Sequence, residues 1–448
     1  MGFSPCFPAF VGPAFRSGLV GCDSQIAPFC VRYNDHRMLS FSDARQLVIV
    51  QSKSLAGIRP TITLPVSDAL GHILAEEVRS DREYPPFNRA TRDGYAVSAA
   101  EAHPGVTLHC IGEIKAGDTV SQPLTPGTCL QIMTGAAVPS GANAVIMIEF
   151  TQRKDDAVTF DRPTQPGQNI VARGSEAHAG DLALSLGLRL GFAELAVAAQ
   201  VGAIALRCYK KPRVAILSTG DEVVPITETP GPFHIRNSNT VSLAAQIRIA
   251  GGEPVPLLNA LDRVDDLSSK IEQGLREDIL VLSGGVSMGK YDLVESVLKG
   301  MGAEFFFDAV AIRPGKPAVF GRCRNTLVFG LPGNPVSTMV TFQLFVIPAL
   351  DVLSGTEPRP LPLLEATLAE PLQENPSLTH FLPARLEWPS SVAPTLSRLS
   401  GEVRPLRWQG SGDIAALTHA NCFLVVPPER SQISAGEKVS ILPRLDVL

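Results

Sequence analysis

At 448 residues the chain is too long for one ordinary domain, and 45% hydrophobic with 19% charged residues is normal for a soluble protein with a sizeable core. The net charge of −5 excludes a global basic field for nucleic acid or an anionic membrane, so affinity for an anion must come from local groups. The eight scattered cysteines form no Cys-x-x-Cys pair, which favours reduced, structural cysteines in a cytoplasmic protein. No apolar run is long and uninterrupted enough to predict a membrane span.

The first segment, residues 1–37, is rich in Pro, Gly and Phe, and Pro5, Pro8 and Pro13 interrupt the apolar centre that a signal peptide needs. We expect this segment to be a disordered extension. Met38 precedes a helix start that Ser40 or Ser42 would cap, so the hypothesis is that the natural chain starts at Met38. Intact mass of the protein from its native host tests this, and a mature chain beginning at Met1 or Gly2 would contradict it.

Residues 42–58 are predicted to form a helix, and residues 65–78 a strand followed by a helix. A polar loop around Asp93 follows a Pro-Pro break, and it suits either a linker between domains or a binding loop. Frequent Gly and Pro between short apolar runs then predict a small β domain over residues 95–173. Within it Thr134 alone indicates a turn residue more than a ligand contact. Residues 191–202 read as a helix.

Beyond Lys210-Lys211-Pro212, strands alternate with helices, which is typical of βαβ units in a parallel sheet. Strands are predicted near Arg213, Glu253, Ile279, Glu304 and Thr326. The predicted helices cover residues 238–250, 263–276, 291–301 and 335–353.

Polar, glycine-containing loops follow the predicted strands of this region. One such loop could simply be a tight turn between a strand and a helix, but ligands of doubly wound sheets bind at the carboxyl ends of strands, so three such loops together indicate a site. Free amides at the helix starts would attract an anion. The loops carry Ser218, Thr219, Gly220 and Glu222; Ser283, Gly284, Gly285, Ser287 and Asp292; and Pro332, Asn334, Pro335 and Ser337.

A further turn places the cations Arg313 and Lys316 between two β segments, which favours binding of an anion such as phosphate. A proline-rich linker at residues 356–362 leads into a last region that is predicted to be β, with strands near Phe381, Cys422 and Val439. In that region the turn around Ser411 indicates a surface loop on sequence alone.

The order and spacing of these motifs resemble the molybdopterin molybdenumtransferase family, of the MoeA and gephyrin E-domain type, over Met38–Leu448. The motifs are Pro85-Pro86-Phe87 with Asp93-Gly94-Tyr95-Ala96, Met133-Thr134-Gly135-Ala136, Ser218 to Glu222, Ser283 to Ser287, Pro314 to Pro317 and Leu331 to Ser337. The resemblance implies a multidomain α/β plus β fold: a doubly wound α/β domain that resembles molybdopterin-binding domains, an inserted β domain and a C-terminal β-barrel. The implied boundaries are 38–85 with 179–210 for domain I, 86–178 for domain II, 211–357 for domain III and 358–448 for domain IV.

The resemblance further implies a Mg²⁺-dependent transferase that takes molybdate and adenylylated molybdopterin and gives molybdenum cofactor and AMP. Members of the family form homodimers, whose sites lie between domain III of one chain and domain II of the other. A molybdopterin adenylyltransferase and recipient molybdoenzymes would then be partners, whereas nucleic acid and membrane would not.

Roles follow from the resemblance together with the chemistry of a phosphoanhydride, whose cleavage requires Mg²⁺ or cations on its oxygens. The implied catalytic residues are Asp292, Glu222, Asp93 and Lys316, and the metal ligands are Asp292 and Glu222. By resemblance, Asp93, Thr134 and Glu176 come from the partner chain. The candidate substrate contacts are Thr134, Glu176, Ser218, Thr219, Gly220, Asp262, Ser283, Gly284, Gly285, Ser287, Arg313, Pro332, Asn334, Pro335, Ser337 and Ser411.

The sequence departs from the family pattern where Thr91-Arg92 precede Asp93 and where Glu176 replaces the common aspartate, which leaves molybdate or tungstate open as the preferred anion. Two other functions compete with this one. A molybdopterin adenylyltransferase shares the α/β domain, but the attached domains argue against it. A non-catalytic, gephyrin-like scaffold would not need Asp292, Glu222 and Lys316.

Overall fold

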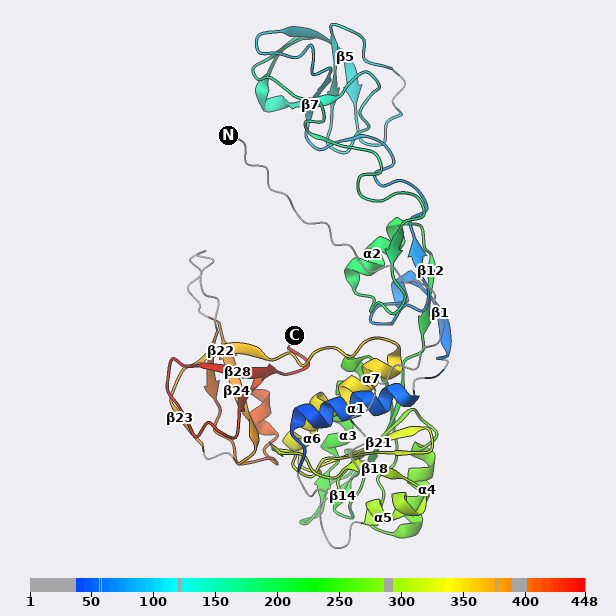
Figure 1. Ribbon diagram of the computed structural model, residues 1–448, viewed down its shortest axis with the longest axis vertical. Helices are drawn as coiled ribbons and strands as arrows, with labels where there is room; N and C mark the ends of the chain where they lie inside the picture. Colours follow the sequence, from blue (N-terminus) through cyan, green and yellow to red (C-terminus); the bar gives the residue numbers. More distant parts are fainter. Residues whose placement is uncertain are drawn as a thin grey trace, which may run out of the picture. The chain divides into compact units, whose positions relative to one another are not determined.

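The computed structural model describes residues 38–55, 57, 59–119, 122–285, 293–374, 377–388 and 401–447 (Figure 1). The expectations for residues 1–37 concern a segment outside these ranges. The first described helix is α1 (Phe41–Leu55), and Ser40 begins it as predicted, because its Oγ accepts a hydrogen bond of 3.1 Å from the Asp43 amide.

The predicted helix before Val78 is wrong. The structure has strand β1 (Thr61–Pro65) and a single 3₁₀ turn η1 (Val66–Asp68), after which Gly71 turns the chain with a φ of +76°. Ile73 and Leu74, which lie in the stretch predicted to be helical, instead make β-bridges to a distant part of the chain.

That distant part supplies strands to the same small unit. Strand β1 pairs antiparallel with β12 (Ala205–Tyr209), and β2 (Val78–Arg79) pairs with β11 (Leu182–Leu184). Helix α2 (Phe192–Gln200) lies between β11 and β12 in the chain, as predicted. The residues between β2 and β11 form the β domain, so two separated segments build one core around Leu74, Leu184 and Leu206.

The β domain is a six-stranded sheet in the order β7-β4-β6-β5-β9-β8, with a two-stranded β3–β10 ribbon beside it. Buried residues on its two faces form separate clusters, one around Tyr95 and Phe160 and the other around Leu130 and Ile132. The strands are β3 (Arg89–Ala90), β4 (Gly94–Val97), β5 (Thr107–Ile114), β6 (Thr128–Ile132), β7 (Ala144–Met147), β8 (Thr151–Lys154), β9 (Ala157–Phe160) and β10 (Ile170–Val171), with a 3₁₀ turn η2 (Ile148–Phe150).

The α/β region is a six-stranded sheet in the order β16-β13-β17-β21-β20-β18, in which the first four strands are parallel. The last two strands run antiparallel to their neighbours, which the sequence did not indicate. The strands are β13 (Arg213–Ser218), β16 (Glu253–Pro256), β17 (Ile279–Ser283), β18 (Glu304–Phe307), β20 (Val319–Cys323) and β21 (Thr326–Leu331); a small β14 (Val223–Val224) and β15 (Ile235–Arg236) pair follows β13.

Helices cover both faces of this sheet, so it is doubly wound as predicted (Figure 1). Side chains alternate along each strand. In β13, Val214 and Ile216 pack toward α1, α3 (Ser238–Ala250) and the long helical segment after β21. Ala215 and Leu217 pack toward α4 (Val264–Gly274) and α5 (Leu293–Gly300). These helices begin and end within three residues of the predicted bounds where the structure describes them.

The long segment is α6 (Pro335–Thr341), a π-helical turn η3 (Phe342–Val346) and α7 (Ile347–Ser354). By length and hydropathy the whole Pro335–Ser354 stretch could cross a membrane, contrary to the sequence analysis. However, 89% of its apolar window is buried inside the protein, as in the core helix of a soluble domain.

The C-terminal region is a closed barrel, because β24 pairs with both β25 and β26 in the order β24-β25-β22-β28-β26. Its core includes Leu382, Leu424 and Ile441. The short β19 (Ile312–Arg313) extends this sheet by pairing with β24. The other elements are β22 (Leu364–Leu368), β23 (Leu372–Gln373), β24 (Thr379–Glu387), β25 (Glu402–Pro405), η4 (Ala415–Thr418), β26 (Cys422–Val426), β27 (Gln432–Ile433) and β28 (Lys438–Pro443).

Candidate functional site

A cavity of about 620 Å³ opens at the carboxyl ends of β13 and β17. The chain passes from β13 outward to β16 on one side and then returns to β17 on the other, so the strand order reverses between these two strands. Crevices at such a reversal are the usual ligand sites of open α/β sheets. The cavity volume lies within the range of roughly 300–1,000 Å³ that is common for small-molecule sites.

Most of the predicted substrate contacts in the α/β region line this cavity, because the three strand-end loops meet there. Backbone hydrogen bonds join the loops: the Thr219 amide donates to the Ser283 carbonyl at 3.1 Å, and the Gly284 amide donates to the Leu331 carbonyl at 3.2 Å. The predicted residues in the lining are Ser218, Thr219, Gly220, Glu222, Asp262, Ser283, Gly284, Gly285, Pro332, Asn334 and Pro335.

Two glycines are required where the β17 loop passes Thr219. Gly284 and Gly285 have φ values of +93° and +63°. A Cβ on Gly284 would lie 2.9 Å from the Thr219 carbonyl oxygen, and one on Gly285 would lie 2.5 Å from the Thr219 hydroxyl. Only glycine allows both the conformation and the close approach, so this loop can reach the cavity wall without a side chain in the way.

The end of β15 and the start of α3 contribute lining residues that sequence reasoning missed, namely Arg236, Asn237, Ser238 and Asn239. Asn237 is the N-cap, and its Oδ1 accepts a hydrogen bond of 3.1 Å from the Thr240 amide. The sequence did contain a signal for these residues. It predicts that a helix begins at residue 238, and a helix that follows a parallel strand begins at the carboxyl edge of the sheet. Pro317, Gly333, Gly412 and Ile414 were missed as well.

The carboxylates of the cavity lie close together. Glu222 and Asp262 both line it, and the Asp262 amide donates a hydrogen bond of 3.0 Å to Asp221 Oδ1. Burial raises the pKa of Asp262, and the negative charges of Asp221 and Glu222 raise it further. This edge of the cavity therefore carries negative charge that a bound cation would offset.

The two cations that are predicted to bind an anion do not line the cavity. Arg313 and Lys316 are exposed, while Pro317, directly after Lys316, is part of the cavity wall. Among the described residues, Arg236 is the cation that lines the cavity. Its Nε donates a hydrogen bond of 3.0 Å to the Glu228 carbonyl. The anion-clamp role of Arg313 and Lys316 stays a prediction.

The barrel reaches the cavity through the turn that the sequence marked as a surface loop. Ser411 does not line the cavity, but its Oγ accepts a hydrogen bond of 2.8 Å from Asn334 Nδ2 and its carbonyl accepts one of 3.0 Å from the Val336 amide. Gly412 of the same turn lies in the lining. Ser337 is buried in the first turn of α6 and is outside the lining.

Asp93, Thr134 and Glu176 belong to the β domain and do not line this cavity. The backbone amide and the hydroxyl of Thr134 donate to Asp93 Oδ1 at 2.6 and 2.7 Å, and these bonds lower the pKa of Asp93. Glu176 forms an ion pair of 3.2 Å with Arg89. The structure thus brings Asp93 and Thr134 together, and the predicted role of these residues in a partner's site stays a prediction.

Asp292 and Ser287 lie outside the described residues, so their predicted roles stay predictions. Within the described ranges, His, Cys, Asp and Glu side chains form no group of three or more that could hold a metal ion.

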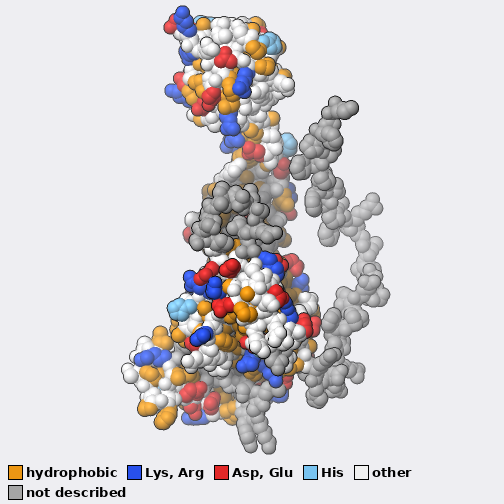
Figure 2. Space-filling model, turned by 90° about the vertical axis from the view of Figure 1, so that its left-hand side faces the viewer, with side chains coloured by type: hydrophobic (Ala, Val, Ile, Leu, Met, Phe, Trp, Pro, Cys, Tyr) orange, Lys and Arg blue, Asp and Glu red, His pale blue; other side chains and the backbone are white. Residues whose placement is uncertain are grey.

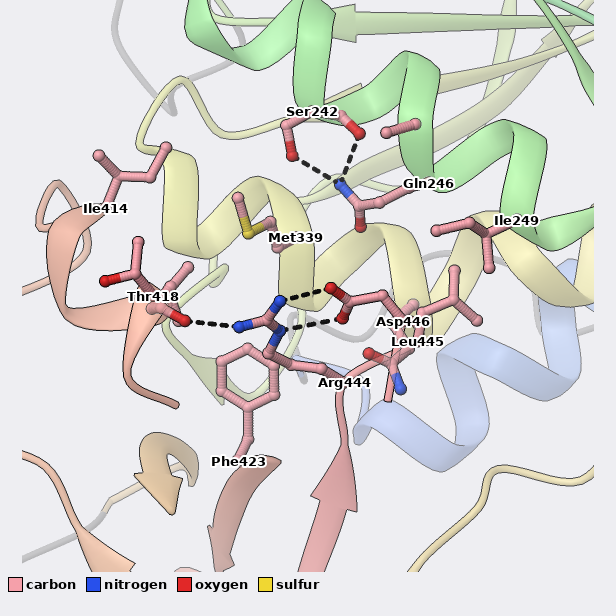
Figure 3. Close-up of a pocket in the computed structure, with 13 residues that line it drawn as sticks. Ser242, Gln246, Ile249, Met339, Ile414, Thr418, Phe423, Arg444, Leu445 and Asp446 are labelled. Carbon is pink, nitrogen blue, oxygen red and sulfur yellow. Dashed lines mark hydrogen bonds and ion pairs between the residues drawn. The ribbon is translucent and has the colours of Figure 1, made fainter. Parts of the chain in front are cut away.

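A second cavity of about 240 Å³ lies beside the first, between α3, α6, η4 and the end of β28, and Ile414 lines both (Figure 3). Its charged residues, Arg444 and Asp446, point toward each other and form an ion pair (Figure 3). Arg444 Nη1 also donates to the Leu417 and Ala420 carbonyls, both at 2.6 Å. Since these charges are already paired, the larger cavity is the better candidate for a charged ligand.

Comparison with known proteins identifies the family. Family models match residues 39–202 as the MoeA N-terminal region (domain I and II), 215–352 as a probable molybdopterin binding domain and 365–443 as the MoeA C-terminal region (domain IV). Molybdopterin molybdenumtransferase from Staphylococcus aureus (strain Mu50) is 30% identical over 406 residues, which cover 89% of this chain and 94% of that protein.

The molybdopterin molybdenumtransferase of Staphylococcus epidermidis is 30% identical over 387 residues, covering 85% of this chain and 90% of that protein. The crystal structure of the molybdopterin biosynthesis moeA protein from Pyrococcus horikoshii OT3 superimposes with a TM-score of 0.71 and 27% identity, covering 91% of this chain and 100% of that one. The chain therefore belongs to the MoeA family of molybdopterin molybdenumtransferases, which are transferases of molybdenum cofactor biosynthesis.

Proposed function

We propose that the chain transfers molybdate to adenylylated molybdopterin and releases AMP, with the reaction taking place in the cavity at the ends of β13 and β17. The observation that carries this proposal is the composition of the cavity wall. Hydroxyls, glycine-rich backbone and carboxylates converge there from separate strand-end loops. This combination suits a ligand that carries both a phosphoanhydride and a ring system.

The residues present fit a Mg²⁺ ion. Mg²⁺ binds hard oxygen ligands, usually one or two carboxylates together with phosphate oxygens and water. Glu222 and Asp262 line the same cavity, and burial, together with the negative charges of Asp221 and Glu222, raises the pKa of Asp262. Glu222 would hold the ion with Asp262 nearby, and Asp292 is the further ligand that the family resemblance implies. When bound, the ion would neutralise charge on the phosphoanhydride oxygens.

The chain's own groups would bind and orient the substrates. Arg236 lies in the wall, and the exposed Arg313 and Lys316 stand on the neighbouring turn, where they would attract an anion. Positive groups near the phosphoanhydride and the molybdate would stabilise the negative charge that develops as the bond to AMP breaks. Asp93, Thr134 and Glu176 of a second copy would complete the site in a homodimer, with Arg92 at its rim.

We further propose that the protein works in the cytoplasm, receives its substrate from a molybdopterin adenylyltransferase and supplies molybdoenzymes. The described cysteines are free and buried, which suits a reducing compartment. On the face shown in Figure 2, basic and acidic side chains are interspersed over the described residues. This pattern gives that face no extended basic stripe for nucleic acid.

The test is AMP release from adenylylated molybdopterin, measured with and without molybdate and with and without a chelator of Mg²⁺. We expect release that requires both molybdate and Mg²⁺. A second arm supplies ATP and molybdopterin, and formation of pyrophosphate there would instead support an adenylyltransferase. If neither arm shows turnover while both substrates bind, the scaffold function gains support and the transferase proposal fails.

A further inference from the structure

Three hydroxyl groups lie at the point where the strand order reverses, on Ser218, Thr219 and Ser283. Each of these residues is only 3% exposed and each lines the cavity. A buried hydroxyl needs hydrogen-bond partners, and a hydroxyl can donate one hydrogen while it accepts others. The partners that each already has decide which of them can still bind a ligand.

The Ser218 hydroxyl is already engaged. Its Oγ donates to Asn237 Oδ1 at 3.1 Å and lies 2.9 Å from the Thr240 hydroxyl, which is placed to donate in return. Both partners belong to the start of α3. The Ser218 side chain therefore links β13 to that helix and has no hydrogen left for a ligand.

The Thr219 hydroxyl, unlike that of Ser218, has no hydrogen bond within the described ranges. Its Oγ1 is buried and has no hydrogen-bond partner among the described residues. A Cβ on Gly285 would lie 2.5 Å from this oxygen, so only glycine lets the β17 loop pass beside it. An unpartnered buried hydroxyl costs free energy unless a ligand or water satisfies it.

The Ser283 hydroxyl is oriented by Asn239, a half-buried residue in the first turn of α3. Asn239 Nδ2 donates one hydrogen to Ser283 Oγ at 2.9 Å and the other to the Gly333 carbonyl at 2.7 Å. Because Ser283 accepts from the amide, its own hydrogen is left to donate elsewhere. The same amide also ties the β17 loop to the β21 loop.

We infer that Asn239 is a positioning residue that turns the Ser283 hydroxyl into a hydrogen-bond donor, and that Ser283 and Thr219 together donate to one anionic oxygen of the substrate. The oxygen belongs to a tetrahedral oxyanion, either the phosphoryl group of adenylylated molybdopterin or molybdate. This inference rests on the proposed function. It assigns hydrogen-bond donors to a cavity whose ionised carboxylates can only accept hydrogen bonds.

The test compares Asn239→Ala and Asn239→Asp in steady-state AMP release, varying adenylylated molybdopterin and molybdate separately. Loss of one charge-assisted hydrogen bond predicts a rise of about 10- to 100-fold in the KM of one substrate, and the substrate affected identifies the oxyanion. Asn239→Asp keeps the shape, but its carboxylate would accept the Ser283 hydrogen and face the Gly333 carbonyl. We expect it to impair binding at least as much as Asn239→Ala.

The matched control is Asn421→Ala in the barrel. Asn421 also bridges backbone with its amide, since its Oδ1 accepts from the Leu386 amide at 2.7 Å and its Nδ2 donates to the Leu386 carbonyl at 2.9 Å. It lies outside the cavity lining. We expect Asn421→Ala to lower the melting temperature while leaving both KM values at the parental level, which separates loss of stability from loss of substrate positioning.

Ser283→Ala tests the same donor without changing Asn239. It should raise the same KM, and Asn239→Asp combined with Ser283→Ala should add little, because both remove one hydrogen bond. If Asn239→Ala does not fold, Asn239→Asp and Ser283→Ala still decide the question. Parental KM values in these variants, or a milder effect of Asn239→Asp than of Asn239→Ala, would overturn the inference. A parent that releases no AMP would instead overturn the proposed function.

Discussion

At the scale of single residues, Asp93 shows how a loop can hold a carboxylate ionised. Two hydrogen bonds from Thr134 stabilise the charged form and lower its pKa. Since the folded pKa is lowered, the interaction stabilises the fold above the unfolded pKa and is lost as the pH falls through the folded value. At neutral pH the carboxylate is therefore fully charged and available to a substrate or cation.

Thr134→Val should raise the pKa of Asp93 toward its ordinary value, because the hydroxyl that donates at 2.7 Å is gone while the backbone bond remains. The carboxyl carbon of Asp93, followed by NMR across acidic pH, measures this. Thr107→Val serves as the control, since that hydroxyl contacts Thr159. An unchanged Asp93 titration in Thr134→Val would contradict the assignment.

Lys316 tests the anion clamp. Lys316→Ala and Lys316→Gln should both weaken substrate binding by about 1.5–3 kcal/mol if the ammonium makes a charge-assisted hydrogen bond, because the charge matters and the length does not. Isothermal calorimetry with adenylylated molybdopterin and with molybdate measures the change. Lys154→Gln, an exposed lysine of the β domain, is the matched control. Parental affinity in both Lys316 variants would remove this residue from the site.

Which site residues the sequence could predict depends on where the chain places them. Ser218 and Ser283 end buried strands and Asn334 follows one in the next loop, and this pattern is visible in the linear sequence. Arg236 ends β15 and Asn239 lies in the first turn of α3, so the β14–β15 pair separates both from β13. Only the rule that a helix after a parallel strand begins at the carboxyl edge of the sheet could have placed them at the cavity. Gly412 lines the cavity because the barrel contacts the α/β region, and no local sequence pattern shows that contact.

At the scale of elements, the β17 loop depends on glycine for two separable reasons. Gly285→Ala introduces both a left-handed alanine and a contact of 2.5 Å with the Thr219 hydroxyl. Gly302→Ala introduces only the first, since Gly302 has a φ of +85° and open space around its Cβ position. We expect a loss of about 1–2 kcal/mol for Gly302→Ala and a larger loss for Gly285→Ala.

Urea unfolding measures both glycine variants, and the KM for adenylylated molybdopterin should rise in Gly285→Ala alone. Equal losses of stability with an unchanged KM would mean that the space beside Thr219 has no role in binding.

The helices were predicted well where their signals are local. The cap Ser40, the start of α3 at residue 238 and the apolar spacing of α5 are visible in short stretches of sequence. The helix expected before Val78 failed because Ile73 and Leu74 pair with residues far along the chain, and such tertiary pairing overrides local periodicity.

At the scale of the whole molecule, the α/β class followed from the alternation of strands and helices. The closed C-terminal barrel was expected from the family resemblance and is confirmed, but no local pattern shows it, because the pairing of β24 with β26 joins residues that the sequence cannot show to be neighbours. The same limit applies to the antiparallel β18 and β20, whose direction is set by connections and not by composition.

The homodimer is the prediction that belongs to this scale. If Asp93 serves the site of a second copy, a mixture of Asp93→Ala chains and Asp292→Ala chains should recover part of the activity that each variant lacks, because some sites then carry both native residues. AMP release by heterodimers purified with two different affinity tags measures this. The absence of recovery would indicate that each site lies within one chain, as would a stable, fully active monomer in light scattering.

The most direct measurement for the site as a whole is the Mg²⁺ dependence of AMP release in the parent and in Glu222→Gln. If Glu222 holds the ion, the half-maximal Mg²⁺ concentration should rise about tenfold or more in Glu222→Gln. It should stay unchanged in Glu365→Gln, whose exposed carboxylate pairs with Lys438 at 3.5 Å on the barrel. If Glu222 only repels the anionic substrate, its removal should lower the KM and leave the Mg²⁺ dependence unchanged, and that result would contradict the placement of the reaction beside Glu222.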